Sequence, residues 1–316
     1  MPRQRDQRFH TGMSHRLGTP AALLLAAALL TLPGPARAQS GETRQTLVVD
    51  GVPRSYLLYV PSGYQPDRPL PLVLVFHGGG SRARLMTTHT GFTTLAMRER
   101  FAVVYPEGLQ GRWNDGRGYG TSHDDVAFVR ALLDSLSRRV TLDSSRLYAT
   151  GISNGAMFAY RLACDLPGVL AAIAPVAGAV PAALAERCAG AAPVAVAAFQ
   201  GTADPLLPYG GGGRGASGRG EVLSALRSAE LWARVDGCGA TPELEAPRDS
   251  VRDGTRVRPR RWTGCRTGRE VVLYTIEGGG HTWPGGPPVA PRVGRVTREL
   301  DATETIWAFF AAHPRS

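Results

Sequence analysis

Two apolar runs limit what this chain can fold into: LAAIAPVAG at residues 170–178 and APVAVAAFQG at residues 192–201. Neither run alternates between polar and apolar residues, as a strand with one face in water would. Strands of this kind belong to parallel sheets that helices cover on both faces. The two runs therefore predict the centre of an α/β domain.

The rest of the chain repeats the order strand, helix, strand. Further strands are predicted at 71–76, 101–106, 145–151 and 270–277, and a hairpin over 46–61 that turns at Asp50-Gly51. Helices are predicted at 81–100, 124–140, 154–164, 221–235 and 301–313, the last with Asp301 and Glu304 as a capping box. This order predicts a mostly parallel, doubly covered sheet in one domain.

The N-terminal segment has the pattern of a secretory signal peptide. An Arg-rich stretch precedes the apolar run AALLLAAALLTLP, and small residues stand at positions 36 and 38. We therefore expect a signal peptide over 1–38 and a single α/β domain over 39–316. The expected location is secreted or periplasmic. A membrane anchor is the alternative, although the apolar run is short for a bilayer span.

The chain has a formal net charge of +10, and all 36 of its basic residues are Arg. These Arg residues are scattered, whereas a nucleic-acid-binding protein concentrates them on one element with interleaved aromatic residues. The pattern indicates a solvated surface and no nucleic-acid partner. No apolar run after the signal peptide is long enough to cross a membrane.

Four cysteines remain after export, which suits disulfides in an oxidising compartment. We predict sequential pairing, Cys164 with Cys188 and Cys238 with Cys265, which closes two short loops. Metal binding is the alternative, but no C-x-x-C pair supports it.

The stretch GISNG, residues 151–155, has the form G-x-S-x-G. Ser153 directly follows a predicted strand and opens a predicted helix, the context of a nucleophile elbow. The backbone N–H of Asn154 is then a donor for an oxyanion. The alternative is an ordinary helix cap between two glycines, because so short a pattern arises by chance in a chain with 39 glycines.

A serine nucleophile needs a base, and in α/β-hydrolases the acid and then the histidine follow the serine along the chain. Two histidines follow Ser153. His281 stands just after a predicted strand in EGGGHTWPGG, at the edge where such sheets bind ligands. His313 lies in the tail of the last helix, so we predict His281.

The orienting carboxylate is predicted at Asp204, in the loop after the apolar strand 192–201. A plain turn before Pro205 is the alternative reading of this residue. Asp236, Asp253 and Glu277 are the rival carboxylates, and they are less well placed relative to strand ends.

FHGGGS, residues 76–81, predicts a second oxyanion donor after an early strand, from the N–H of Gly79 or Gly80. A phosphate-binding P-loop is excluded, because no G-K-S/T follows. His77 is expected to be structural.

Three further features have two readings each. Trp113 and Trp283 are predicted to wall the substrate pocket, with simple packing as the alternative. The glycine-rich segment 209–220 is expected to be a surface loop, with a substrate loop as the alternative. Asp124 and Asp125 read as helix caps rather than as a catalytic carboxylate pair.

The motifs HGGG, GISNGAM, GTADPLLPY and GGGHTWPG occur in this order, with RWND…DDVAFVRALL between the first two. In this combination the chain resembles secreted poly(3-hydroxybutyrate) depolymerases and feruloyl esterases, a group of α/β-hydrolases like carbohydrate esterase family 1. The resemblance covers nearly all of residues 43–312. It implies Ser153 as nucleophile, His281 as base and Asp204 as its partner.

The chemistry implied is two-step acyl transfer, which needs no metal or cofactor. The expected substrate is a small or oligomeric ester of a hydroxyalkanoate, or a feruloyl or acetyl ester derived from polysaccharide. No Ser/Thr-rich linker or added C-terminal module follows, which favours soluble esters over insoluble polyester. A peptidase, an acyltransferase and a catalytically silent carbohydrate-binding protein on this fold are the alternatives.

Overall fold

The computed structural model describes residues 40–118, 121–213, 220–266 and 268–315. The predicted signal peptide lies outside these residues. The strands are β1 Gly41–Val49, β2 Val52–Val60, β3 Leu70–Phe76, β4 Ala102–Pro106, β5 Leu142–Ile152, β6 Ala172–Val176, β7 Ala195–Gly201, β8 Glu243–Leu244, β9 Arg256–Trp262 and β10 Val271–Glu277. The α-helices are α1 Ala83–Thr90, α2 Phe92–Glu99, α3 Asp125–Ser137, α4 Asn154–Asp165, α5 Ala185–Ala189, α6 Ala225–Val235 and α7 Ala302–Ala312.

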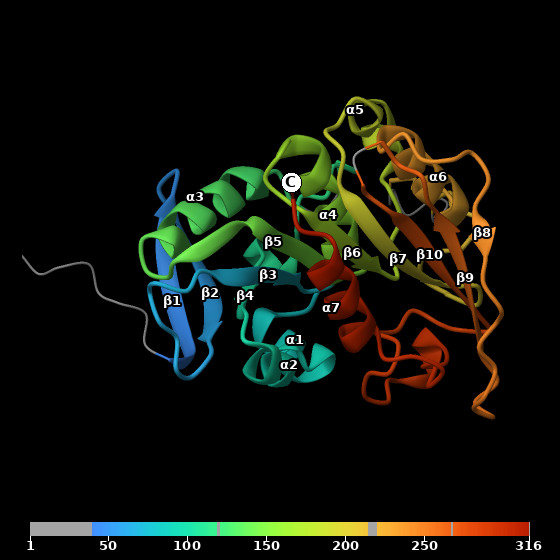
Figure 1. The fold of residues 1–316 in the computed structure, drawn as a ribbon, viewed down its shortest axis with the longest axis horizontal. Helices are drawn as coiled ribbons and strands as arrows, with labels where there is room; N and C mark the ends of the chain where they lie inside the picture. The colour runs from blue at the N-terminus through green and yellow to red at the C-terminus, as the bar shows by residue number, and fades with distance from the viewer. Residues whose placement is uncertain (1–39, 119–120, 214–219, 267, 316) are drawn as a thin grey trace, which may run out of the picture. The chain divides into compact units, whose positions relative to one another are not determined.

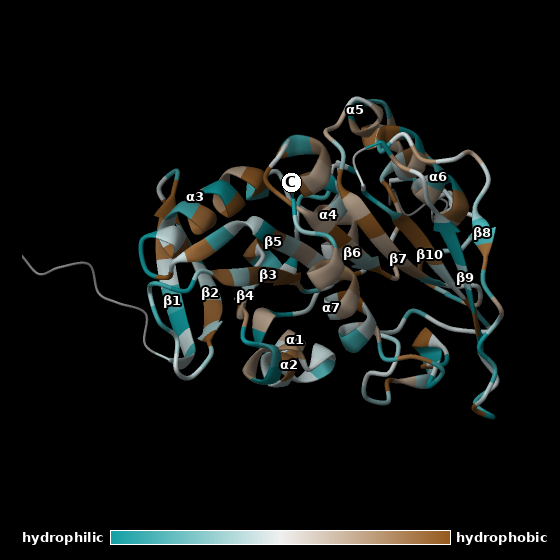
Figure 2. Ribbon diagram, viewed as in Figure 1, coloured by the Kyte–Doolittle hydropathy of each residue, from teal (hydrophilic) through white to brown (hydrophobic). Residues whose placement is uncertain are grey.

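All of these strands belong to one sheet, in the order β1-β2-β4-β3-β5-β6-β7-β10-β9-β8. Neighbours are parallel from β4 through β10, which confirms the predicted parallel centre. The hairpin β1–β2 adds one antiparallel edge, and β8 and β9 add the other. The strand β9 has the Arg-rich sequence RVRPRRW. Figure 2 shows its hydrophilic colouring beside the apolar strands of the centre.

Side chains alternate across the sheet and build a separate core on each face. On β3, Leu74 and Phe76 pack in the core that α3, α4 and α6 cover. Val73 and Val75 point the other way, into the core beneath α1, α2 and α7. Figure 1 shows these helices as layers above and below the sheet. Because both faces are covered, the central strands are apolar throughout.

One predicted helix is wrong in its continuity. The segment 81–100 forms two helices, α1 and α2, that meet at Gly91. Gly91 has φ 69°, a left-handed conformation that ends the first helix at little cost for glycine. The second helix then turns to pack against α7, where Phe101 stacks on Trp307 at 3.9 Å between ring centroids.

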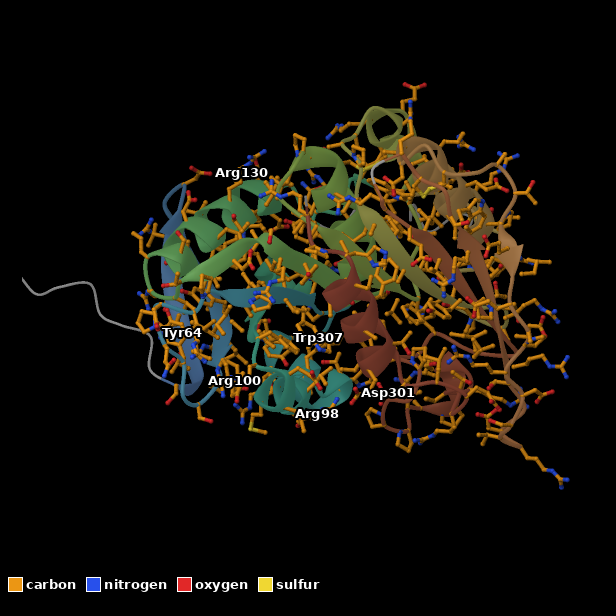
Figure 3. The ribbon with its side chains drawn as sticks, viewed as in Figure 1. Tyr64, Arg98, Arg100, Arg130, Asp301 and Trp307 are labelled. Atoms are coloured by element: carbon orange, nitrogen blue, oxygen red, sulfur yellow. A yellow bond between two sulfur atoms is a disulfide. The ribbon has the colours of Figure 1, made fainter. Side chains whose placement is uncertain are left out.

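The last helix has half of its predicted capping box. Asp301 accepts hydrogen bonds from the N–H groups of Thr303 and Glu304. The Glu304 carboxylate instead pairs with Arg98 of α2 at 2.6 Å. Figure 3 labels Arg98 of α2, Asp301 at the start of α7 and Trp307 within it.

Asp124 and Asp125 have different roles, which corrects their shared reading as caps. Asp124 caps α3 by accepting from the N–H groups of Val126 and Ala127. Asp125 is fully buried and pairs with Arg54 at 2.6 Å. A buried pair of this kind is costly to break, because either partner alone is an uncompensated charge. It ties the hairpin β1–β2 to the start of α3.

Both predicted disulfides are present in the structure. Cys164 at the end of α4 is bonded to Cys188 in α5, and Cys238 after α6 is bonded to Cys265 after β9. Among the described residues, no helix is long and apolar enough to cross a bilayer.

Asp236, at the end of α6, gives the fold a testable pH dependence. Burial raises the pKa of this carboxyl from 3.8 to about 7, although the Val194 N–H and the charge of Arg269 act in the opposite direction. Its Oδ1 accepts from Val194 at 3.0 Å, and its Oδ2 has no partner among the described residues.

We predict that the free energy of unfolding falls as pH rises from about 4 to about 7, because the folded state binds the Asp236 proton more tightly than the unfolded state. Asp236→Asn mimics the protonated carboxyl and should remove this component, worth about 1.4 kcal/mol per pKa unit. Urea denaturation at pH 5 and pH 8 measures it. If the free energy of unfolding changes equally between pH 5 and pH 8 in the wild type and in Asp236→Asn, the burial of Asp236 does not contribute this pH dependence.

Candidate active site

Ser153 stands alone between β5, which ends at Ile152, and α4, which begins at Asn154. Its backbone has φ 59° and ψ −119°, a strained conformation for a residue with a side chain. Its N–H donates to the carbonyl of Val176 at 3.0 Å, which holds the turn. The Ser153 side chain makes no capping hydrogen bond to the helix. Its hydroxyl is therefore not occupied by an ordinary cap.

The two glycines of the motif are required by close backbone contacts. A Cβ on Gly151 would lie 2.7 Å from the carbonyl oxygen of Phe76. A Cβ on Gly155 would lie 2.5 Å from the same oxygen and 2.6 Å from that of His77. The end of β3 and the start of α4 thus approach more closely than any side chain permits. This is the physical reason for G-x-S-x-G at this turn.

Asp204 and His281, predicted as acid and base, are hydrogen-bonded to each other. His281 Nδ1 lies 2.8 Å from Asp204 Oδ2, and the two side chains are 8% and 0% exposed. The other carboxylate oxygen, Oδ1, accepts from the N–H groups of Leu206 and Leu207 at 2.7 and 2.8 Å. Asp204 therefore forms the turn of the alternative reading and also orients the imidazole.

Glycines let the two loops that carry this pair lie against each other. A Cβ on Gly201, at the end of β7, would lie 2.6 Å from the carbonyl carbon of Gly279, after β10. The N–H of Ala203 donates to the carbonyl of Gly279 at 2.9 Å. The N–H of His281 donates to the carbonyl of Val293 at 2.6 Å, which holds the base from the far side.

The rival residues are occupied elsewhere. The Glu277 carboxylate pairs with Arg258 at 2.8 Å, and Asp253 accepts from Thr255 and Arg298. His313 contacts the carbonyl of Phe309 and the Glu270 carboxylate. Asp236 is buried beside Val194, as described above. The structure brings none of the three rival carboxylates to His281.

The loop after β3 distinguishes the two oxyanion candidates. The N–H of Gly80 donates to the carbonyl of Gly111 at 2.8 Å, so this donor is already in use. This corrects the prediction that Gly80 could supply the second oxyanion donor. The carbonyl of Gly78 accepts from His77 Nδ1 at 2.8 Å and from Ser81 at 3.1 Å. In a trans peptide, the next N–H points away from that carbonyl. His77 thereby turns the Gly79 N–H to the opposite side of the loop.

His77 performs this role as a neutral imidazole. Burial lowers its pKa below the ordinary histidine value, and the side chain is fully buried. Its Nε2 accepts from the N–H of Gly108 at 2.9 Å, so Nδ1 carries the proton given to Gly78. The prediction that His77 is structural agrees with these contacts.

The predictions that Trp113 and Trp283 wall the pocket are wrong. Both are buried, 0% and 1% exposed. The Trp113 ring stacks on Phe158 at 5.1 Å, and its indole N–H donates to the carbonyl of His77. The indole N–H of Trp283 donates to Thr303 of α7. Both rings therefore pack in the protein interior and do not line the cavities beside Ser153.

Asn154 has a side-chain role in addition to its backbone N–H. Its Oδ1 accepts from the N–H of Trp113 at 2.8 Å, and its Nδ2 donates to the Trp113 carbonyl at 2.9 Å. Nδ2 also donates to Asp115 at 2.7 Å. The start of α4 is thus fastened to the segment that follows β4.

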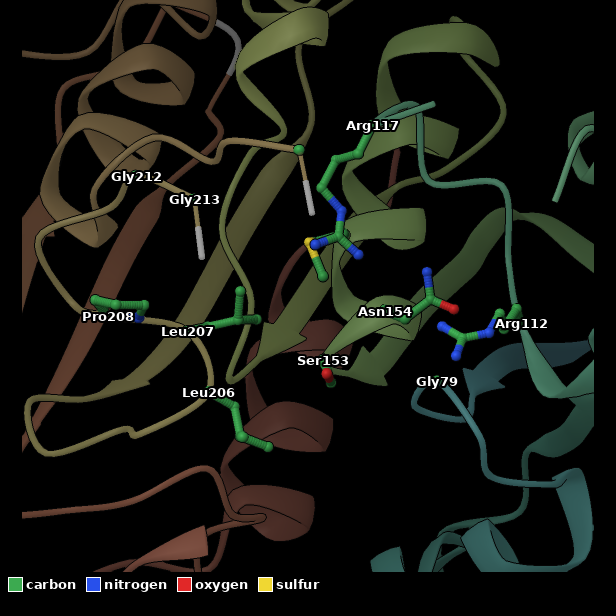
Figure 4. A pocket seen from close by; sticks show the side chains of 12 residues that line it. Gly79, Arg112, Arg117, Ser153, Asn154, Leu206, Leu207, Pro208, Gly212 and Gly213 are labelled. Carbon is green, nitrogen blue, oxygen red and sulfur yellow. The ribbon is translucent and has the colours of Figure 1, made fainter. Parts of the chain in front are cut away.

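Ser153 lines two cavities. The larger, of about 560 Å³, is lined by Ser153, His281 and apolar side chains that include Leu85, Met86 and Val293. The smaller, of about 170 Å³, contains Asn154, Arg112 and Arg117, and Figure 4 shows it. Gly79 lines both. No hydrogen bond joins the Ser153 and His281 side chains in the described structure, and such contacts often form only with substrate bound.

Sequence reasoning missed Arg112, Asp115 and Arg117 as site residues. They stand in RWNDGR, directly after the turn that follows β4. A polar cluster just beyond a strand end is the signal that could have revealed them. The glycine-rich segment contributes Gly212, Gly213 and Gly220 to the smaller cavity. Residues 214–219 lie outside the described part of the chain.

The chain resembles known esterases in sequence and in fold. The family described as esterase PHB depolymerase matches residues 54–205. A putative esterase of Nocardia uniformis subsp. tsuyamanensis, NocK, is 33% identical over 289 residues, 86% of this chain and 83% of NocK. Feruloyl esterase D of Neurospora crassa is 27% identical, over 89% of this chain and 96% of its own length. An acetyl xylan esterase from Aspergillus awamori shares the fold, with a TM-score of 0.59 at 15% identity, over 85% of this chain and 99% of its own.

The doubly covered sheet and these relatives define the class of protein, a carboxylesterase with the α/β-hydrolase fold. Within that class the chain belongs to the esterase PHB depolymerase family.

The contact at Gly155 gives a direct test of the elbow. We predict that Gly155→Ala costs about 1–3 kcal/mol of stability, because its methyl group would displace the backbone at the end of β3. Ester hydrolysis should fall with it, since the same shift moves Ser153. Thermal unfolding and activity toward p-nitrophenyl butyrate measure both effects.

Gly210→Ala is the matched control, because nothing lies within 4 Å of a Cβ at that position. If both variants melt and react alike, the close approach at Gly155 does not constrain the elbow.

Proposed function

We propose that this protein is an exported serine ester hydrolase in which Ser153, His281 and Asp204 form the catalytic triad. The observation that carries the proposal is the buried Asp204–His281 hydrogen bond at 2.8 Å, on a cavity that Ser153 also lines. A strained turn with an uncapped hydroxyl and an imidazole oriented by a carboxylate are the parts that acyl transfer requires.

In the first half-reaction, His281 accepts the Ser153 proton while Oγ attacks the ester carbonyl. Asp204 holds the imidazole in the tautomer whose Nδ1–H points to the carboxylate, and it stabilises the imidazolium. The alcohol leaves with the proton from His281. Water then repeats the sequence on the acyl-enzyme and releases the acid.

The tetrahedral intermediate carries its negative charge where two backbone donors meet. The Asn154 N–H is the first free donor of α4, and the helix dipole adds to its field. The Gly79 N–H, turned by His77, is the second. Loss of one such donor typically costs about 3–4 kcal/mol of transition-state stabilisation.

The proposed substrates are hydroxyalkanoate esters or feruloyl and acetyl esters derived from polysaccharide. Membership in the esterase PHB depolymerase family and the named feruloyl esterases among the relatives support this range. The signal-peptide pattern of residues 1–38 and the two disulfides support export. The proposed partner is an ester substrate, without nucleic acid and without a membrane span after cleavage of the signal peptide.

The triad predicts a graded loss of activity. Asp204→Asn should lower kcat by about 10³–10⁴-fold, because the amide favours the wrong imidazole tautomer. Ser153→Ala should lower it further, to the background left by binding and the oxyanion donors. Initial rates with p-nitrophenyl butyrate, methyl ferulate and hydroxybutyrate oligomers measure the effect, with a peptide substrate as the test of peptidase activity.

Asp253→Asn is the control, because this carboxylate lies outside the proposed triad. It accepts hydrogen bonds from the backbone N–H groups of Thr255 and Arg298. If the wild type hydrolyses none of the esters faster than Ser153→Ala does, the esterase proposal is refuted.

A further inference from the structure

The two cavities beside Ser153 differ in chemistry. They share Gly79, Ser153 and Leu206, so each opens on the nucleophile. His281 lines only the larger cavity, whose other walls include Leu85 and Met86. The two arginines line only the smaller cavity. A bound ester that spans Ser153 therefore has one half in an apolar environment and the other half beside positive charge.

The position of His281 decides which half of the ester lies where. On the proposed function, His281 protonates the departing alkoxide, so the alcohol must lie on the histidine side. The acyl half then lies in the smaller cavity, which Ser153 lines and His281 does not. The apolar cavity is left for the alcohol group.

The Asp115 carboxylate binds both Arg117 and Asn154, and it holds Arg117 in place. Arg117 Nε and Nη2 donate to Asp115, with Nη2 to Oδ2 at 2.7 Å. Asp115 is 1% exposed and also accepts from Asn154. Of the five guanidinium donors, those on Nη1 make no hydrogen bond to any other described residue. The arginine is thus fixed relative to the oxyanion donor, with donors left for a ligand.

Arg112 lines the same cavity. A Cβ on Gly79 would lie 3.7 Å from Arg112 Nη1, so this guanidinium is close to the second oxyanion donor. Figure 4 shows the Arg112 side chain beside Asn154, and the Arg117 side chain extending into the view from above. Of the charged side chains in this cluster, Asp115 pairs with Arg117 at 2.7 Å.

We propose that the preferred substrates are esters whose acyl half ends in a free carboxylate, that is, monoesters of short dicarboxylic acids. Arg112 and Arg117 bind that carboxylate, because planar guanidinium groups match its geometry. The cavity of about 170 Å³ restricts the acyl chain to a few carbons. This inference rests on the proposed serine-esterase function and names its substrate class.

The reaction on such an ester balances without a further reactant. The Ser153 Oγ–acyl bond forms and the acyl–alkoxide bond breaks, with the serine proton passing through His281 to the alcohol. Water then cleaves the acyl–Oγ bond, and the dicarboxylic acid leaves with both carboxyl groups. Its distal carboxylate remains on the arginines until the acid leaves.

Paired esters of equal chain length test the proposal. Monobutyl succinate is compared with butyl butyrate, and monobutyl adipate with butyl hexanoate, so that a carboxylate replaces a methyl group. The measurement is kcat/KM from butanol release in the wild type, Arg112→Gln and Arg117→Gln. Arg138→Gln is the matched control, since this exposed arginine lines neither cavity.

We expect the wild type to favour the charged member of at least one pair by about tenfold or more, the size of one charge-assisted hydrogen bond. The ratio should fall toward one in both cavity variants and persist in Arg138→Gln. It should also fall as salt is added, because the attraction is electrostatic. Because the readout is a ratio within each protein, a general loss of folding or activity does not imitate it.

The outcomes separate the two proposals. If neutral butyl esters are hydrolysed and Ser153→Ala abolishes this, the esterase function stands whatever the ratio. A wild-type ratio of one or less in both pairs, or a ratio that survives in both cavity variants, overturns the carboxylate proposal alone. If Ser153→Ala matches the wild type on every ester, both proposals fail.

Discussion

The close approach of α4 to the end of β3 is the constraint on which the rest of the site depends. Gly155 lies so near the carbonyls of Phe76 and His77 that a methyl group has no room. This contact brings the start of α4 against the loop after β3, so the N–H groups of Asn154 and Gly79 border the same space. At the same turn Ser153 has a positive φ, and its side chain makes no capping hydrogen bond to the helix. One glycine contact thus positions both the proposed nucleophile and the two proposed oxyanion donors.

Glycines also allow a close contact between the two loops that carry Asp204 and His281. Gly201 and Gly279 let the loops after β7 and β10 touch, and that contact brings Asp204 to His281. Parallel strands supply these loops because their carboxyl ends share one edge of the sheet. The layers of helices then exclude water from the sheet, and the buried rings of Trp113 and Trp283 belong to that packing. The site is a surface feature whose precision comes from backbone contacts beneath it.

The positions of Ser153, Asp204 and His281 at strand ends could be predicted, because strand order and chain order are local properties of the sequence. The choice between Gly79 and Gly80 could not, since it depends on how His77 turns one peptide plane. The burial of Trp113 depends on Asn154 and Phe158, which are distant in the chain. The arginine-rich segment that forms β9 fits a loop as well as a strand, and a single glycine such as Gly91 does not by itself predict a break in a helix. Tertiary contacts decide all of these.

The central claim is that Ser153 forms the covalent intermediate. Incubation with diethyl p-nitrophenyl phosphate, which transfers its phosphoryl group to activated serines, followed by peptide mass spectrometry, tests it most directly. The account predicts one equivalent of p-nitrophenol and a label confined to the peptide that contains Ser153, with none in Ser153→Ala. A label on another serine, or equal labelling of the variant, would contradict it.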